Sequence, residues 1–112
     1  MKEILVVSAP DLPGHKITET LGLVRGNTVR ARHLGRDILA GLRNIVGGEV
    51  HEYRKLIAES REQALDQMVA EARELGADAV ISTRMATSMI GQGMAEILVY
   101  GTAVRVAEEI QK

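Results

Sequence analysis

Hydrophobic and polar residues alternate in the first third of the chain, which is the pattern of β-strands. Ile4–Val7 is a continuous apolar run, and a segment rich in turn-forming residues follows at 9–14. These features predict a short buried strand and a loop. From Lys16 to Arg32 the apolar residues lie mostly at odd positions and the polar residues at even positions, which predicts a long half-buried strand.

Glycines interrupt this long strand at Gly22 and at Gly26-Asn27. We expect a β-bulge or a tight bend at these positions, because only small residues tolerate the backbone angles that such a distortion requires. The strand should therefore curve.

The period changes to that of a helix over 33–46, where apolar residues recur four positions apart. Gly35 and Gly41 lie inside this shorter helix, and each costs about 1 kcal/mol relative to Ala. We therefore expect both glycines to mark close approaches of another backbone. Gly47-Gly48 then ends the helix, since consecutive glycines readily adopt positive φ.

A longer amphipathic helix is predicted from Tyr53 to Leu75, where apolar residues recur at three- and four-residue steps. Gly76 follows at the position of a left-handed cap. Two further strands are predicted over Asp78–Met89 and Met94–Val106, joined by a turn at 90–93.

The order β-β-α-α-β-β predicts an α+β fold: a single sheet with one long amphipathic helix and one shorter helix. No internal repeat or linker divides the 112 residues. We therefore expect one domain, 1–112.

Large side chains are scarce, because the chain has no Phe, no Trp and only Tyr53 and Tyr100. A core this poor in aromatic rings hides less apolar area within one subunit and gains from burial between subunits. In the last predicted strand Ile97–Tyr100 is apolar without interruption, so both faces of that strand must be covered. A neighbouring subunit is one candidate for the second face, and the sequence therefore favours a homo-oligomer.

Composition and charge exclude several classes of protein. The chain has no Cys, which excludes disulfides, thiolate metal sites and cysteine nucleophiles. No apolar run reaches the length of a signal peptide or a transmembrane helix, so we expect a cytoplasmic protein without membrane contact. The net charge of −1 conceals an arginine-rich stretch at 25–48 and an acidic stretch at 49–78. We interpret these stretches as solvated faces whose charges pair with opposite charges within or between subunits. The alternative is an anion-binding patch.

A metal site is the weaker of two interpretations of the methionines and histidines. Thioether ligands, which suit copper(I), are offered by Met85, Met89 and Met94. Strand parity instead favours gap-filling roles in a core or interface for the first two. The histidines show no metal-binding spacing; they are His15, His33 and His51. We expect no metal and no cofactor.

The start of the long helix is the better candidate for a ligand site. Free amides at a helix N-terminus carry partial positive charge, Gly47-Gly48 precedes this helix, and Arg43 lies one turn back. The speculative ligand-binding residues are therefore Arg43, Asn44, Gly47 and Gly48, for a small or anionic ligand. Gly91-Gln92-Gly93 is interpreted as a hairpin turn and not as a phosphate loop, because a strand follows it.

Catalysis and nucleic-acid binding find little support. The serines lack the context of a nucleophile elbow and no pair of carboxylates stands apart, so we name no catalytic residue and expect no enzyme activity. The arginine-rich stretch lacks an aromatic platform for stacking bases, which argues against nucleic acid as a partner.

Several segments together carry a resemblance to a known family: Gly41–Gly48, Gly76–Ile81, Ile90–Met94 and Tyr100–Val104. In their order and spacing the chain resembles the YbjQ family of small bacterial and archaeal proteins over nearly its whole length. The resemblance implies a YbjQ-like domain over 1–112, a compact α+β subunit and a ring-like homopentamer. Relatives often have Asp after the arginine, where this chain has Asn44 and one charge fewer.

The leading hypothesis is therefore a non-enzymatic homo-oligomeric protein, pentameric by resemblance, whose partner is itself and which binds a small or anionic ligand. The alternative is a metal-binding protein that uses Met and His ligands. It is motivated by the methionines and by a heavy-metal-binding label that the resembled family carries.

Overall fold

The computed structural model describes residues 2–31, 48–91 and 94–109, and these form one four-stranded sheet with one long helix. The strands lie in the order β1-β3-β4-β2, with β1 parallel to β3 and the other neighbours antiparallel. The elements are β1 (Leu5–Val6), β2 (His15–Ala31), α2 (Gly48–Glu74), β3 (Ala79–Gly91) and β4 (Met94–Glu108). The predicted α+β class with a single sheet is confirmed. The predicted helix over 33–46 lies outside the described residues.

The helix α2 ends where the sequence predicts, at a glycine with positive φ. Gly76 has φ +79°, and its amide donates to the carbonyl of Arg73 at 3.0 Å. The amide of Ala77 donates to the carbonyl of Ala72, also at 3.0 Å. These two bonds form a Schellman motif, and the two alanines are both buried in the core beneath it. The motif turns the chain directly into β3.

The predicted hairpin is also confirmed. Gly91 is paired with Met94, so β3 and β4 are joined through residues 92–93. β4 is the central strand for most of its length, because β2 and β3 pair with it on either side. Residues 92–93 lie outside the described residues, and Ile90 and Gly91 of the predicted turn belong to β3.

The two glycine interruptions of β2 have different causes. The ladder between β2 and β4 shifts register between Thr20 and Gly22, and Gly22 has φ +126°, so the predicted bulge is present there. No register shift occurs at Gly26. A Cβ on Gly26 would overlap the carbonyl oxygen of Ala64 in α2 and lie 2.8 Å from the amide nitrogen of Met68. The prediction of a bulge or bend at Gly26 is wrong: this glycine permits the helix backbone to approach the strand.

The side of β2 that faces the helix is not the apolar side that its alternation suggests. Val24 and Gly26 are buried against α2, and Thr28 bonds to it. Leu23 and Val29 point to the opposite side and are 62% and 49% exposed. The odd-numbered side chains of this part of β2 are therefore uncovered within one chain.

The core divides between the two faces of the sheet. The larger cluster lies between α2 and the sheet, and its fully buried members include Met68, Val24, Ile97 and Val99. A smaller cluster lies on the other face, where Leu12, from the segment between β1 and β2, covers Ile81 and Val104. Within the part of the chain that the structure describes, the end of the sheet near β1 is thus covered on both faces.

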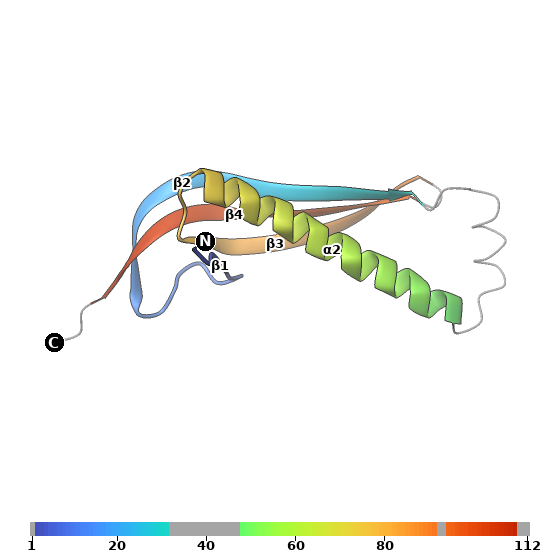
Figure 1. Ribbon diagram of the computed structural model, residues 1–112, viewed down its shortest axis with the longest axis horizontal. Coiled ribbons are helices and arrows are strands. Elements are labelled where there is room, and N and C mark those ends of the chain that lie inside the picture. The colour runs from blue at the N-terminus through green and yellow to red at the C-terminus, as the bar shows by residue number, and fades with distance from the viewer. Residues whose placement is uncertain (1, 32–47, 92–93, 110–112) are drawn as a thin grey trace.

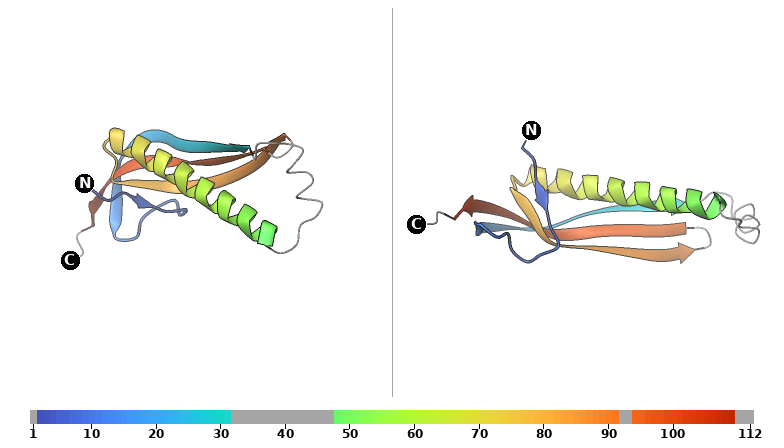
Figure 2. Two further views of the ribbon diagram at one scale, coloured as in Figure 1. Left: turned by 45° about the vertical axis from the view of Figure 1, so that its right-hand side comes forward. Right: turned by 90° about the horizontal axis from the view of Figure 1, so that it is seen from below.

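The chain is elongated. Figures 1 and 2 show α2 lying diagonally along one side of the sheet, while the hairpin of β3 and β4 extends away from the end that carries β1. The radius of gyration is 18.1 Å, against about 13 Å for a compact domain of this length. The accessible surface is 7633 Å², against roughly 6,100 Å² for a compact monomer of this mass. One chain therefore leaves more surface uncovered than its size requires.

Candidate functional site

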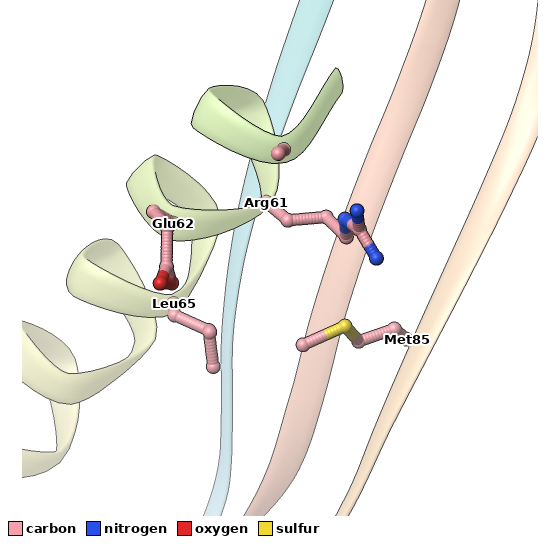
Figure 3. A pocket seen from close by; sticks show the side chains of 5 residues that line it. Arg61, Glu62, Leu65 and Met85 are labelled. Atoms are coloured by element: carbon pink, nitrogen blue, oxygen red, sulfur yellow. The ribbon is translucent and has the colours of Figure 1, made fainter. Parts of the chain in front are cut away.

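A groove separates α2 from β3, because the helix packs mainly on β2 and β4. It consists of two adjoining cavities of about 570 Å³ and 290 Å³ that share Glu62, Leu65 and Met85. Figure 3 shows Met85 extending from β3 toward Arg61 and Leu65 on α2. A volume of this order lies within the usual range for small-ligand sites.

The chemistry of the groove suits an apolar occupant. Its larger cavity is lined by Val6, Val7, Leu65, Val69 and Met85, with Ser8 and Thr83 at one end. On the helix side the larger cavity also carries the carboxylates of Glu62 and Asp66. Two carboxylates one helical turn apart disfavour an anion in the larger cavity.

A strained residue lies next to Thr83, which lines the groove. Ser82 has φ +54°, which is uncommon for a residue with a Cβ. The β3 ladder shifts register between Ile81 and Arg84, so two residues bulge outward beside β1. Their amides are satisfied by the segment after β1: Ser82 donates to Ala9 and Thr83 to Val7. The bulge is thus held by backbone hydrogen bonds to the segment after β1.

Beyond this bulge the residues of β3 are exposed, and β4 is the strand that pairs with them. The segment Arg84–Gly91, here called the distal β3 segment, consists of eight consecutive exposed residues. It is paired with β4, whereas β1 pairs only with Ala79 and Val80. Met85 and Met89 are 48% and 65% exposed. The prediction that these methionines share strand parity is correct, but within one chain they fill no core gap.

The sheet face opposite α2 carries a second uncovered surface, here called the open face. Tyr100 lies between Arg25 of β2 and Arg84 of β3 in the register, so the three side chains share this face. Leu23, Val29 and Leu98 belong to the same face. The expectation that Ile97–Tyr100 needs cover on both sides is therefore met on one side by α2, whereas on the other side Tyr100 is 37% exposed.

Polar residues join the helix α2 to the strand β2. The Oγ of Ser60, which is fully buried, accepts from Nε of Arg30 at 2.6 Å and donates to the carbonyl of Leu56 at 2.9 Å. Arg30 also donates to the side chain of Gln63, and Thr28 donates to the Ser60 carbonyl at 3.1 Å. Arg30, which sequence reasoning assigns to a solvated or anion-binding face, therefore anchors the helix.

Replacing Ser60→Ala should destabilise the fold. The change removes the acceptor of the Arg30 Nε–H, and an unpaired, partly buried donor costs about 1–3 kcal/mol. Ser88→Ala, at an exposed position on β3, should change the free energy of unfolding by less than about 0.5 kcal/mol. Urea denaturation followed by circular dichroism measures both, and equal values for the two variants would contradict the anchoring role.

Most of the predicted ligand site cannot be compared with the structure. Arg43, Asn44 and Gly47 lie outside the described residues. Gly48 is the first residue of α2, which agrees with the predicted position of a helix start. The site itself stays a prediction.

The metal candidates do not converge within one chain. Met85 and Met89 lie on the helix side of β3, but Met94 pairs with Gly91 and Ala31 and lies on the open-face side of β4. The sheet thus separates the third sulfur from the other two. No group of three His, Asp or Glu side chains suited to a metal ion occurs within 2–31, 48–91 and 94–109. The residues that the structure describes therefore do not form a metal site within a single chain.

The segment Gly76–Ile81, one of those that carry the family resemblance, has a structural explanation. The carboxylate of Asp78 accepts from the amide of Val106 at 2.9 Å and forms an ion pair with Lys2. The amide of Asp78 donates to the carbonyl of Val104 at 2.9 Å. This aspartate fixes the register of β3 against β4 at the end of α2. Sequence reasoning missed this role, because nothing local distinguishes a register-fixing carboxylate from a solvated one.

Comparison with known proteins identifies relatives along nearly the whole chain. Residues 4–107 match a family model named YbjQ and described as "Putative heavy-metal-binding". A UPF0145 protein of Pyrococcus furiosus is 58% identical over 109 residues, which cover 97% of this chain and 96% of that protein. A UPF0145 protein of Archaeoglobus fulgidus is 52% identical over 105 residues, covering 94% and 97%.

A solved structure shows the same fold at low sequence identity. It is a protein of unknown function of the DUF74 family from Pediococcus pentosaceus, with a TM-score of 0.64 and 12% identity. The match covers 93% of this chain and 98% of the other. Among the described residues no helix is both long and apolar enough to cross a membrane.

Proposed function

Since this chain belongs to the YbjQ family of UPF0145 proteins, we propose that it works as one subunit of a closed homo-oligomer and not as an enzyme. The observation that carries the proposal is the uncovered apolar surface of the open face and the distal β3 segment. A second copy of the chain is the occupant that is always present with it.

The shape of the chain supports self-association. A radius of gyration of 18.1 Å and a surface of 7633 Å² exceed what a compact monomer of this size needs. The excess surface is roughly 1,500 Å² over a compact monomer. In a standard interface each partner buries about 800 Å². Burial of this excess between subunits would bring the accessible surface of each chain down to that of a compact protein of its mass.

The composition of the uncovered surface gives the same indication. Leu23, Val29 and Tyr100 all lie on the open face, with exposed fractions of 62%, 49% and 37%. Along β2, Arg25 and Asn27 separate Leu23 from Val29 on this face. A single exposed apolar side chain is normal on a surface, whereas several large ones on one face of a sheet favour an interaction site. These side chains lie on two paired strands, β2 and β4, whose backbone hydrogen bonds hold them in place before association.

The first test is native mass spectrometry of protein purified without chelator. We expect one species with a whole number of chains, five if the resemblance to ring-forming relatives holds, and no additional mass. A monomer at micromolar concentration would overturn the proposal. Additional mass on the assembly would identify a metal or a small ligand directly.

Charges placed on the open face should break the assembly. The double variant Leu23→Glu/Val29→Glu puts two carboxylates on the open face, one toward each end of its β2 side, and burying unpaired charges is costly. We expect light scattering to give the mass of a single chain. Ala70→Glu, at an exposed position of α2, is the control and should keep the wild-type mass. A wild-type mass for the double variant would show that this face is not an interface.

Metal binding through Met and His is the alternative function. It is supported by the family description and by the exposure of Met85 and Met89 on one side of β3. Because Met94 lies across the sheet, a shared site would need ligands from more than one chain. The mass spectrum described above distinguishes the two proposals, since a bound metal adds mass to the assembly.

A further inference from the structure

The larger cavity of the groove between α2 and β3 carries negative charge. Of the residues that line it, Glu62 and Asp66 are the charged ones, and none is Lys, Arg or His. Arg61 lines the adjoining smaller cavity, and Arg84 lines neither cavity. The lining of the larger cavity therefore favours a cation over an anion.

The two carboxylates also lack a basic neighbour on the helix. Glu62 and Asp66 are four residues apart, and side chains at this spacing lie next to each other on a helix surface. Every other residue three or four positions from either one is uncharged or acidic. Within 2–31, 48–91 and 94–109 neither carboxylate forms an ion pair. Like charges at this spacing destabilise a helix, so a cation bound between them would stabilise α2.

A buried polar atom in the same cavity lacks a partner. Thr83 lines the cavity, and its Oγ1 is buried without a hydrogen-bond partner in the part of the chain that the structure describes. This oxygen lies beside Gly101 of β4, where a Cβ would come within 3.1 Å of it. An unpaired buried hydroxyl is costly and uncommon in folded proteins. It indicates that a hydrogen-bonding molecule belongs in this cavity.

The rest of the lining is mostly apolar. Val6, Leu65 and Val69 are half-buried, and Met85 is 48% exposed. Leu65 of α2 and Met85 of β3 extend toward each other across the groove (Figure 3). A hard metal ion is surrounded by oxygen ligands, and this apolar wall offers none. The cavity instead suits a cation with an apolar body.

We propose that the larger cavity binds a small organic cation, namely a primary amine with an apolar chain. The ammonium group binds between Glu62 and Asp66, and the chain packs on Leu65, Val69 and Met85. A cavity of about 570 Å³ has room for such a molecule. The inference goes beyond the proposed function and does not depend on self-association.

NMR of the methionine methyl groups tests the proposal on the full chain. The chain has five Met residues, of which Met85 lines both cavities and Met89 lines neither. n-Hexylammonium chloride is titrated into protein labelled with ¹³C at the methionine methyls, with EDTA present to remove metal ions. Met85→Leu and Met89→Leu assign the two signals. We expect the Met85 signal to move and saturate with a Kd on the order of 1 mM, and the Met89 signal to stay in place.

Matched ligands and variants separate charge from apolar contact. Hexan-1-ol and hexanoate have the same chain length with a neutral and a negative head group, and both should bind about tenfold more weakly or worse. Glu62→Gln/Asp66→Asn should weaken hexylammonium by about tenfold or more, because it removes both charge-assisted acceptors. Glu71→Gln/Glu74→Gln removes the same net charge at exposed positions of α2 outside the groove, and should bind as wild type does.

Three results would overturn the amine site. The first is a Met85 signal that stays in place at millimolar hexylammonium. The second is an equal response to hexan-1-ol, which would show an apolar groove without a preference for charge. The third is wild-type affinity in Glu62→Gln/Asp66→Asn, which would place the amine elsewhere. Light scattering on the same samples reports self-association separately, so the failure of one proposal is distinguishable from the failure of the other.

Discussion

Replacing Gly26→Ala should destabilise the protein by about 3 kcal/mol or more, near or above the upper end of the range for overpacked cores. A Cβ at this position would overlap the carbonyl oxygen of Ala64 and lie 2.7 Å from Cβ of Gln67 and 2.8 Å from the nitrogen of Met68. Two of these three atoms are helix backbone, which cannot rotate away. The helix and β2 would have to separate.

Chemical denaturation at one fixed protein concentration measures the loss. Gly91→Ala is the matched control, since its nearest neighbour would be the flexible Met94 side chain at 3.6 Å, an ordinary contact. The control should stay within about 0.5 kcal/mol of wild type. A Gly26→Ala protein as stable as Gly91→Ala would contradict the close approach of α2 to β2.

Replacing Met68→Ala should cost about 2–5 kcal/mol, the range for removing a large aliphatic side chain from a packed core. Met68 is fully buried between α2 and the sheet, where it packs with Val24, Ile97 and Val99. Because the chain has no Phe or Trp, small aliphatic neighbours have little capacity to fill the space. The unfilled cavity adds to the lost transfer energy.

Thermal and urea unfolding measure this effect. Leu75→Ala is the comparison, because Leu75 is 41% exposed just after α2 and should lose less than about 1 kcal/mol. Met68→Leu should recover most of the stability, since volume-conserving exchanges usually cost less than about 1.5 kcal/mol. Equal losses for Met68→Ala and Leu75→Ala would contradict a core centred on Met68.

The elements of the fold could be predicted from the sequence wherever a local pattern specifies them. The three- and four-residue steps that end at Leu75 predicted α2, although its N-terminal end lies five residues earlier than Tyr53, at Gly48. Gly76 predicted the cap because the positive φ is a local requirement. The hairpin of β3 and β4 followed from a glycine-rich turn between two strand-like runs.

The face of β2 that is buried could not be predicted. Alternation places Leu23 and Val29 on one side, but the helix packs on the side of Val24 and Gly26. A strand with apolar residues on both sides is compatible with either choice. The choice depends on which side of β2 lets the helix backbone approach. The close approach of the Ala64 carbonyl to Gly26 decides it.

The candidate sites divide in the same way. Sequence reasoning placed Met85 and Met89 on one side of a strand, but could not show that the strand extends beyond its neighbours. The network of Arg30 and Ser60 joins residues 30 positions apart, and no spacing rule relates them. Arg43, Asn44 and Gly47 lie outside the described residues and stay a prediction from the free amides at a helix start.

The sequence by itself determined the class of fold, the long helix and its cap, the hairpin and the aliphatic core, because propensity, periodicity and turn chemistry act over a few neighbouring residues. The tertiary structure decided which faces are covered. It placed the helix on Gly26, satisfied the amides of the β3 bulge with the segment after β1, and left the open face and the distal β3 segment bare. Those outcomes depend on contacts between residues far apart in the chain, where packing and hydrogen bonding outweigh local preference.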